Sequence, residues 1–240
     1  CSSLTQISIP SSVTQIGWHA FEGCSSLTQI SIPSYVTQIG CGIFDKCSKL
    51  TKIIIKKKEK QFINFIDEQF LVYKSDQTSN NYDILLFVIC KSNEIIIPPF
   101  IKTIGSSAFS GCSSLTQISI PSSVTQICSR IFGKCSKLNK IIIQKEENQF
   151  INFIDEQFLV YKSDRTSNNY DILLFVICES NEIIIPPFIK KIGAYAFSGC
   201  SSLAKISFEN PSSITQIGDY AFNRCSSLTQ ISIPSSVTQI

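Results

Sequence analysis

The stretch CSSLTQISIPSSVTQI at residues 1–16 decides the fold, because it recurs unchanged at 112–127 and at 225–240. Related stretches fill the chain between these copies, and most of them begin with a cysteine. The spacing from one such cysteine to the next is 23 residues, as between Cys1 and Cys24. Tandem units of 20–50 residues indicate a solenoid, in which each unit forms one coil and contacts only its neighbours.

A longer period is superimposed on this one, since residues 24–111 are copied by residues 112–199 with a period of 88 residues. Each copy contains one unit that is 19 residues longer than the others. The chain begins and ends inside the repeat and has no methionine, so we expect it to be a fragment of a longer array. The units cover 1–23, 24–46, 47–88, 89–111, 112–134, 135–176, 177–199, 200–224 and 225–240.

The segment LTQISIP predicts a β-strand, because apolar and polar residues alternate along it. Leu4, Ile7 and Ile9 should point into the core, and Gln6 and Ser8 should point outward. The proline that follows ends the strand, since it has no N–H to donate to a ladder. VTQIG then predicts a second short strand that ends at a glycine turn.

The next segment, WHAFEGC at 18–24, predicts one short helical turn that buries Ala20 and Phe21. A phenylalanine occupies the same place in most units, so these rings are expected to stack along the array. The predicted stack contains Phe21, Phe44, Phe109, Phe132, Phe197 and Phe222.

The pattern LxxIxIPxxVxxIGxxAFxxCxx resembles the BspA-like leucine-rich repeats of surface proteins in bacteria and protozoan parasites. The resemblance extends over the whole chain and implies a single right-handed leucine-rich-repeat solenoid domain over 1–240. Ile43 and Ile131 depart from the pattern by replacing the small alanine, and Cys128 replaces the turn glycine. If that glycine has a positive φ, Cys128 is strained by roughly 1 kcal/mol.

The two longer units are predicted to carry β-hairpins, within 56–93 and 144–181, like the hairpin-bearing repeats of that family. FLVYK and ILLFVI have the composition of strands, and the segment SDQTSNNYD between them is rich in turn residues. An isolated hairpin is only marginally stable in water, so it needs a surface on which to pack.

The outward position of Ser8 indicates such a surface, because isoleucine replaces serine only in the coils beside a hairpin. We expect each hairpin to fold back and bury its pair of isoleucines, Ile54 with Ile96 and Ile142 with Ile184. The column reads Ser8, Ser31, Ile54, Ile96, Ser119, Ile142, Ile184, Ser207 and Ser232.

The neighbouring column, which begins at Gln6, contains charges of opposite sign in the same coils. Lys52 with Glu94, and Lys140 with Glu182, are expected to pair across adjacent strands and help to fix the register. A competing interpretation is that the isoleucines form a ligand patch. The aromatic residues Phe70, Tyr73, Tyr82 and Phe87, with their copies, would belong to that patch.

The eleven cysteines predict neither a metal site nor a fixed disulfide framework. No C-x-x-C occurs, and His19 is the only histidine, so zinc is not expected. We favour buried thiols that act as small side chains and weak donors. Disulfides between adjacent coils are the alternative, and they require suitable Cβ directions.

The hairpin turns at 75–83 and 163–171 are the predicted binding sites, since loop tips on a rigid scaffold often carry function. The candidate binding residues are Tyr73, Ser75, Asp76, Asn80, Tyr82, Tyr161, Ser163, Asp164, Asn168 and Tyr170.

Composition and motifs argue against other classes of protein. Charged residues make up 16% of the chain and the net charge is +3, too weak and dispersed for a nucleic-acid-binding surface. The apolar run at 84–90 is too short to span a bilayer, so no membrane insertion is expected. Asp67-Glu68 and Asp155-Glu156 are sequence neighbours rather than carboxylates placed across a cleft. We therefore expect no enzyme, no catalytic residue, no cofactor and no metal.

The predicted function is a non-enzymatic protein-binding or adhesion module whose partner is a host or matrix protein, the partner class that the family resemblance implies. The alternative is an intracellular scaffold, which free thiols and the absence of an N-x-[ST] sequon favour. Localisation therefore stays open. End-to-end self-association of exposed coils is expected, and a third idea is a periodic ice or glycan binder using Thr5, Thr28, Thr116 and Thr229.

Overall fold

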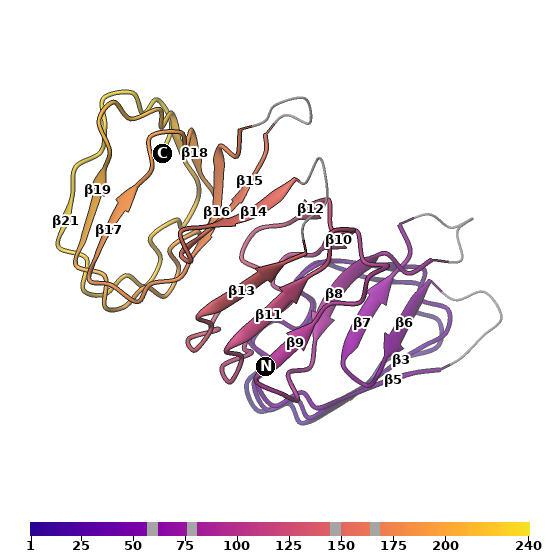
Figure 1. Cartoon of the computed structure of the whole chain (residues 1–240). Coiled ribbons are helices and arrows are strands. Elements are labelled where there is room, and N and C mark those ends of the chain that lie inside the picture. The colour runs from indigo at the N-terminus through magenta and orange to yellow at the C-terminus, as the bar shows by residue number, and fades with distance from the viewer. Residues whose placement is uncertain (57–61, 76–80, 145–149, 164–168) are drawn as a thin grey trace. The chain divides into compact units, whose positions relative to one another are not determined.

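The computed structural model describes residues 1–56, 62–75, 81–144, 150–163 and 169–240. Across these ranges the chain forms β-strands and turns, and no helix occurs among them. The described part therefore also has no helix that could span a membrane. The coils stack as a β-solenoid, and each ordinary coil contributes two strands, one to each of two columns (Figure 1).

The first column is formed by the LTQISIP segments. Its strands are β1 (Gln6–Ser8), β3 (Gln29–Ile32), β5 (Lys52–Ile55), β9 (Glu94–Ile96), β11 (Gln117–Ile120), β13 (Lys140–Ile143), β17 (Glu182–Ile185), β19 (Lys205–Phe208) and β21 (Gln230–Ile231).

The second column is formed by the VTQIG segments and by the ILLFV strands of the longer units. Its strands are β2 (Gln15–Ile16), β4 (Gln38–Ile39), β8 (Ile84–Val88), β10 (Thr103–Ile104), β12 (Gln126–Ile127), β16 (Ile172–Val176), β18 (Lys191–Ile192) and β20 (Gln216–Ile217).

The first column consists of three three-stranded sheets, and coils within one sheet, such as β1-β3-β5, pair in parallel with equivalent residues opposite each other. Ile7 lies opposite Ile30, and Ile30 lies opposite Ile53, so the inward isoleucines of successive coils stack directly. The predicted alternation is confirmed in β3, where Ile30 and Ile32 are buried while the intervening Ser31 is partly exposed. The 23-residue period of the sequence thus sets the register of the ladder.

The chain divides into two compact units. Unit 1 comprises Cys1–Leu115 and Gln126–Lys137, and unit 2 comprises Thr116–Thr125 and Leu138–Ile240. Each unit has its own core, formed by inward residues of both columns and by the turn phenylalanines. The single-domain boundary of 1–240 stays a prediction.

The inserts form antiparallel strands, as predicted, but they contain one more strand than the sequence indicated. In the first copy, β6 (Ile63–Ile66), β7 (Phe70–Tyr73) and β8 form a meander, and β8 also pairs in parallel with β10. The second copy repeats this with β14 (Ile151–Ile154), β15 (Phe158–Tyr161), β16 and β18. Each insert therefore adds two antiparallel strands to a second-column sheet, next to β8 or β16.

The prediction of a short helical turn was wrong. The WHAFEGC segments instead form turns with two residues of positive φ placed four positions apart, which an α-helix does not contain. In the first coil these residues are His19 (φ 56°) and Gly23 (φ 73°). The same spacing recurs at Gly42 and Lys46, Ser107 and Gly111, Arg130 and Lys134, Tyr195 and Gly199, and Tyr220 and Arg224.

The phenylalanine stack is confirmed within each unit. The ring centroids of Phe21 and Phe44 are 5.7 Å apart, and those of Phe197 and Phe222 are 5.4 Å apart. The stack has one member that the sequence pattern missed, since Phe87 of β8 meets Phe44 edge-on at 5.2 Å. Such aromatic pairs contribute about 0.5–1.5 kcal/mol each beyond the area they bury. Ala20, expected to be buried, is exposed in the first coil.

The glycines after β4, β10, β18 and β20 are required by close backbone approach and not by their φ. A Cβ on Gly193 would lie 2.8 Å from the Leu173 carbonyl oxygen of the preceding coil, and a Cβ on Gly40 would lie 2.5 Å from the backbone nitrogen of Trp18. These glycines lie outside the positive-φ region, so the strain expected at Cys128 is absent.

Two disulfides correct the expectation of free thiols. Cys90 is bonded to Cys112, and Cys178 to Cys200, each with a Cα–Cα distance of 5.4 Å. Seven cysteines are free, and the expected role is confirmed for three of them. Their Sγ atoms contact the Phe carbonyl oxygen of a neighbouring coil, namely Cys47 to Phe21, Cys135 to Phe109 and Cys225 to Phe197.

The glycine column provides a stability test. Gly193→Ala should lower the free energy of unfolding by about 1–3 kcal/mol, because the new methyl group overlaps the Leu173 carbonyl. Gly17→Ala is the matched control, since no atom lies within 4 Å of its Cβ position. Urea unfolding followed by circular dichroism measures both changes. Equal midpoints for the two variants would contradict the role given to backbone approach.

The thiols should differ sharply in reactivity. Burial raises the pKa of Cys47 and of Cys135 to about 12, so at pH 7.5 neither has appreciable thiolate, whereas Cys1 is exposed. Iodoacetamide followed by mass spectrometry should modify Cys1 in the native protein and spare Cys47 and Cys135.

Seven thiols should react after denaturation without reductant, and four more after reduction. Alkylation of Cys90 or Cys178 in the absence of a reductant would show that these disulfides do not form.

Candidate functional site

The two serines among the predicted binding residues lie at the bases of the hairpin turns, where each donates hydrogen bonds to a buried aspartate. The Ser75 amide donates to Asp83 Oδ1 at 2.9 Å, and its hydroxyl donates to Oδ2 at 2.7 Å. Ser163 binds Asp171 in the same way and at the same distances. Both aspartates are buried. These serines therefore close the turn, which leaves other residues to meet a partner.

The predicted tyrosines divide between the core and the rim of the turns. Tyr73 is partly buried and donates its hydroxyl to the Thr37 carbonyl at 3.1 Å. The Lys74 ammonium lies 5.0 Å from the centroid of the Tyr82 ring, and Lys162 lies 5.1 Å from that of Tyr170. Such cation–π contacts rigidify the base of the turn.

Tyr161, at the end of β15, is partly buried, as is its copy Tyr73. The remaining predicted site residues, Asp76, Asn80, Asp164 and Asn168, lie outside the described residues.

Asp171 is the most strongly organised carboxylate of the hairpin. Burial raises its pKa, but the two Ser163 hydrogen bonds and the Lys190 ammonium, 3.4 Å from Oδ2, outweigh that effect. The pKa of Asp171 therefore lies below its ordinary value. The backbone carbonyl of Asp171 also accepts from the amides of Lys190 and Lys191, which joins the turn to the next coil.

The predicted burial of the isoleucine pairs was wrong. Ile96 is 72% exposed and Ile184 is 53% exposed, while Ile54 and Ile142 are 39% and 37% exposed. The reason is topological, because each hairpin pairs into the second column and leaves the outward face of the first column uncovered. We call this face, which carries the Ser8 column and the Gln6 column, the outward strand face.

The predicted charge pairs were also wrong. Lys52 lies in β5, which ends the sheet β1-β3-β5, whereas Glu94 belongs to a different sheet, and Lys140 and Glu182 are separated in the same way. The pairing rule holds one coil later, where Glu182 lies opposite Lys205 with their charged atoms 2.6 Å apart. Both side chains are over 40% exposed, so this pair adds little stability.

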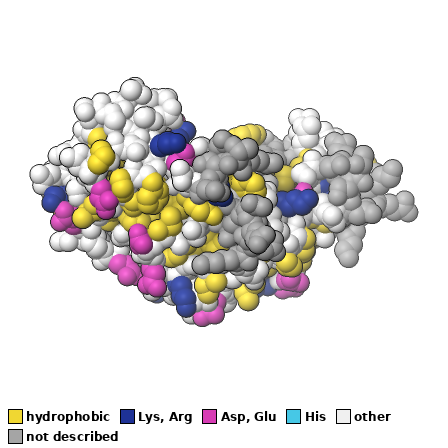
Figure 2. Space-filling view, turned by 45° about the horizontal axis from the view of Figure 1, so that its top comes forward, with side chains coloured by type: hydrophobic (Ala, Val, Ile, Leu, Met, Phe, Trp, Pro, Cys, Tyr) yellow, Lys and Arg dark blue, Asp and Glu magenta, His cyan; other side chains and the backbone are white. Residues whose placement is uncertain are grey.

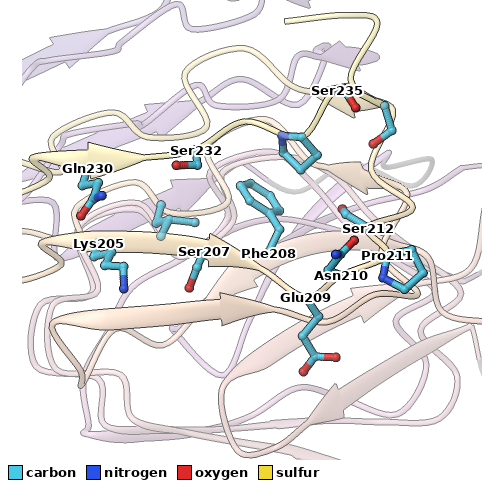
Figure 3. A pocket seen from close by; sticks show the side chains of 13 residues that line it. Lys205, Ser207, Phe208, Glu209, Asn210, Pro211, Ser212, Gln230, Ser232 and Ser235 are labelled. Atoms are coloured by element: carbon cyan, nitrogen blue, oxygen red, sulfur yellow. The ribbon is translucent and has the colours of Figure 1, made fainter.

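A cleft opens on unit 2 beside β19 and β21, and its volume is about 480 Å³. In Figure 3, Phe208 lies among Ser232, Ser212 and Asn210, while Glu209 points away from the ring. The sequence signal was the insertion of Glu209 and Asn210 before Pro211.

A cluster in unit 1 has the composition of a metal site but not its electrostatics. Ligand atoms of His19, Glu22 and Asp45 lie within 4.8 Å of one another. Lys46 already pairs with Glu22, and Arg130 lies 2.9 Å from the buried Asp45 carboxylate. Two cations thus neutralise the two acids, and the residues form an ion-pair network and not a cation cage.

The threonine columns are also structural. The Thr28 hydroxyl donates to the Thr5 carbonyl at 3.2 Å, and Thr229 donates to the Ala204 carbonyl at 3.3 Å. A hydroxyl that donates to a backbone carbonyl of the neighbouring coil is less available to an ice lattice or a glycan. These hydrogen bonds therefore weaken the prediction of a periodic ice or glycan binder. Among the described residues we find no acid, base and nucleophile arranged for catalysis.

The Asp171 cluster predicts a pH-dependent stability. A lowered folded pKa contributes stability above the unfolded pKa of about 3.9, and this is lost as pH falls through the folded value. Ser163→Ala removes a donor and should cost about 1–2 kcal/mol at pH 7. The difference from the wild type should shrink below pH 4.

Chemical denaturation at pH 7, 5 and 3 tests this, with Ser202→Ala as the control on the surface. A cost for Ser163→Ala that is the same at all three pH values would exclude a charged hydrogen bond.

The chain was compared with known proteins. Among solved structures it resembles a leucine rich cell surface protein from Faecalibacterium prausnitzii A2-165, with 28% identity, a TM-score of 0.57, and 92% of this chain and 51% of that chain covered. It also resembles a leucine-rich repeat protein from Eubacterium ventriosum ATCC 27560, with 22% identity and a TM-score of 0.55, over 97% of this chain and 61% of that one.

The pneumococcal vaccine antigen PcpA is a third similar structure, with 19% identity, a TM-score of 0.52, and 97% of this chain and 51% of that chain covered. The chain thus spans about half to three fifths of these proteins. No match was found among curated proteins. The BspA type leucine rich repeat region matches in six copies over residues 1–82, 85–163 and 171–240. The chain therefore belongs to the BspA-type leucine-rich repeat family.

Proposed function

We propose that the chain is a non-enzymatic adhesion module that uses the outward strand face to bind a host or matrix protein at a cell surface. The observation that carries the proposal is the exposure of isoleucine on that face. Ile96 and Ile184 replace the serine found in most other coils, and both are more than half exposed. Ile96 belongs to unit 1 and Ile184 to unit 2, so each unit presents its own exposed apolar group as a site of protein contact.

Each of these isoleucines has an apolar neighbour. Phe100 follows Ile96, Phe188 follows Ile184, and both rings are 40% exposed. Figure 2 shows exposed hydrophobic side chains that are bordered by Asp, Glu, Lys and Arg side chains. An apolar centre with a polar rim is typical of a protein–protein interface.

The two 88-residue copies support multivalent binding. Each copy presents the same isoleucine and phenylalanine, so a partner with a repeated epitope is held at two points of one chain. The second contact is then intramolecular and raises the overall avidity without any new type of contact. The rims of the hairpin turns at Tyr82 and Tyr170 stay a predicted second contact.

An exported location is favoured over the intracellular alternative. Disulfides persist in oxidising compartments and are rare in the cytosol, and this chain has two. Both occupy equivalent positions in the two copies, which supports a structural role for them. The missing glycosylation sequons and the seven free thiols are weaker observations. Three of these thiols are buried and four are partly or fully exposed. Burial keeps a thiol such as Cys135 unreactive even in an oxidising compartment.

The proposal is tested with the double variant Ile96→Ser and Ile184→Ser, which restores the residue of the other coils and should fold. Biolayer interferometry on immobilised fibronectin, laminin and collagen should show binding to at least one of them. The double variant should weaken that binding about tenfold or more, since each buried isoleucine contributes about 1.5–3 kcal/mol.

Trp18→Ser is the matched control, because it removes a 75% exposed apolar side chain from a turn instead of a strand. It should leave binding unchanged. Absence of binding to all three proteins, or equal binding by the double variant, would refute the proposed function.

A further inference from the structure

The cleft beside β19 lies where the solenoid departs from its repeat. Glu209 and Asn210 lengthen the connection before Pro211, and Phe208 takes the place of an isoleucine. The isoleucine is retained in β3, β11 and β17 as Ile32, Ile120 and Ile185, which are all at most 1% exposed. Phe208 is only partly buried and borders the cleft.

Neutral polar side chains dominate the wall of the cleft. Hydroxyl and amide groups can each donate and accept hydrogen bonds, which suits a ligand that carries many hydroxyl groups. The apolar lining is of similar extent and consists of Ile206, Phe208, Pro211 and Pro234. The polar lining includes Ser207, Ser212, Ser232, Ser235, Asn210 and Gln230, which are drawn in Figure 3.

The charges at the cleft are already engaged or directed elsewhere. The Lys205 ammonium pairs with Glu182 at 2.6 Å. Glu209 points away from the Phe208 ring (Figure 3). A strongly anionic or cationic ligand would therefore have to compete with an existing ion pair, and the cleft favours an uncharged ligand.

One buried hydroxyl in the wall lacks a partner. The Ser236 Oγ atom is buried and makes no hydrogen bond with the described residues, while Ser236 itself lines the cleft. Buried polar groups in folded proteins are nearly always paired, so each exception calls for an explanation. Rotation of the Ser236 side chain toward the cleft would let a ligand hydroxyl supply the missing partner.

We propose that this cleft binds a neutral oligosaccharide, a ligand class separate from the protein partner proposed above. A sugar ring combines hydroxyl groups around its edge with an apolar C–H face, and the cleft offers serine and amide groups around an aromatic ring. The volume of about 480 Å³ falls within the range of small-molecule sites. Ser207 already donates to Glu182 at 3.5 Å, and Ser212 accepts from the Ile214 amide at 3.4 Å, so each of these hydroxyls keeps further hydrogen-bonding capacity for a ligand.

A peptide fits less well than a saccharide. Peptides bind to sheets mainly by adding a strand along an open edge. β19 pairs with β17 along its whole length, and β21 pairs with Lys205 and Ile206, so only Ser207 and Phe208 have no strand opposite them on one side. Two residues are a short edge for an added strand, and most of the wall of the cleft is made of side chains.

The proposal is tested by isothermal titration of the chain with cellotetraose, maltotetraose, chitotetraose and mannotetraose. At least one should bind with a dissociation constant below about 1 mM. Phe208→Ile restores the isoleucine of the other coils and so should fold, and it should weaken binding about tenfold by removing the aromatic face. Thermal unfolding verifies that the variant is folded.

A serine pair provides the matched control. Ser207→Ala, in the cleft, should weaken saccharide binding severalfold by removing one hydrogen bond. Ser31→Ala, at the same outward position in β3 of unit 1, should not change it. Failure of all four saccharides to bind at 10 mM (about tenfold above the expected limit) would overturn the proposal. Equal binding by Phe208→Ile, or binding of a Ser-Pro-rich peptide at this cleft instead, would overturn it too.

Discussion

The close approach of the backbone of one coil to that of the next is the constraint on which the rest of the structure depends. The amide that follows a second-column strand donates to a carbonyl one coil earlier, as from Gly40 to Ile16 and from Gly193 to Leu173, at 2.7–2.8 Å. At Gly40, Gly105, Gly193 and Gly218 a Cβ would overlap the preceding coil, whereas Cys128 makes the same backbone contact with a side chain in place. Period, register and core stacking follow from keeping this contact between successive coils.

Most of the scaffold could be predicted from the sequence, because every coil of a solenoid repeats the same local conformation. Alternation within LTQISIP identified the inward isoleucines, and the spacing of the phenylalanines identified the ring stack. The turn was misjudged because Ala-Phe segments also occur in helices. Only the positive φ of residues such as His19 and Lys46 distinguishes the observed turn, and many residue types occupy those positions.

The placement of the hairpins shows where sequence reasoning ends. Alternation in FLVY and ILLFV indicates that these strands have two different faces, but not which sheet they join. Pairing of β8 with β10, and of β16 with β18, decides this and leaves Ile96 and Ile184 exposed. The cleft at Phe208 was equally hidden, since a two-residue insertion shows that a connection is longer but not that it opens a cavity.

The disulfides give the solenoid a mechanical property. Cys90 and Cys112 are 22 residues apart, so their bond encloses about one complete coil, and Cys178 with Cys200 does the same in the other copy. Noncovalent coils peel away one at a time when a chain is pulled from its ends, because each is held only by its neighbours. The enclosed coils cannot lengthen under such a load while the bonds remain, so an oxidised chain under tension has two segments of fixed contour length.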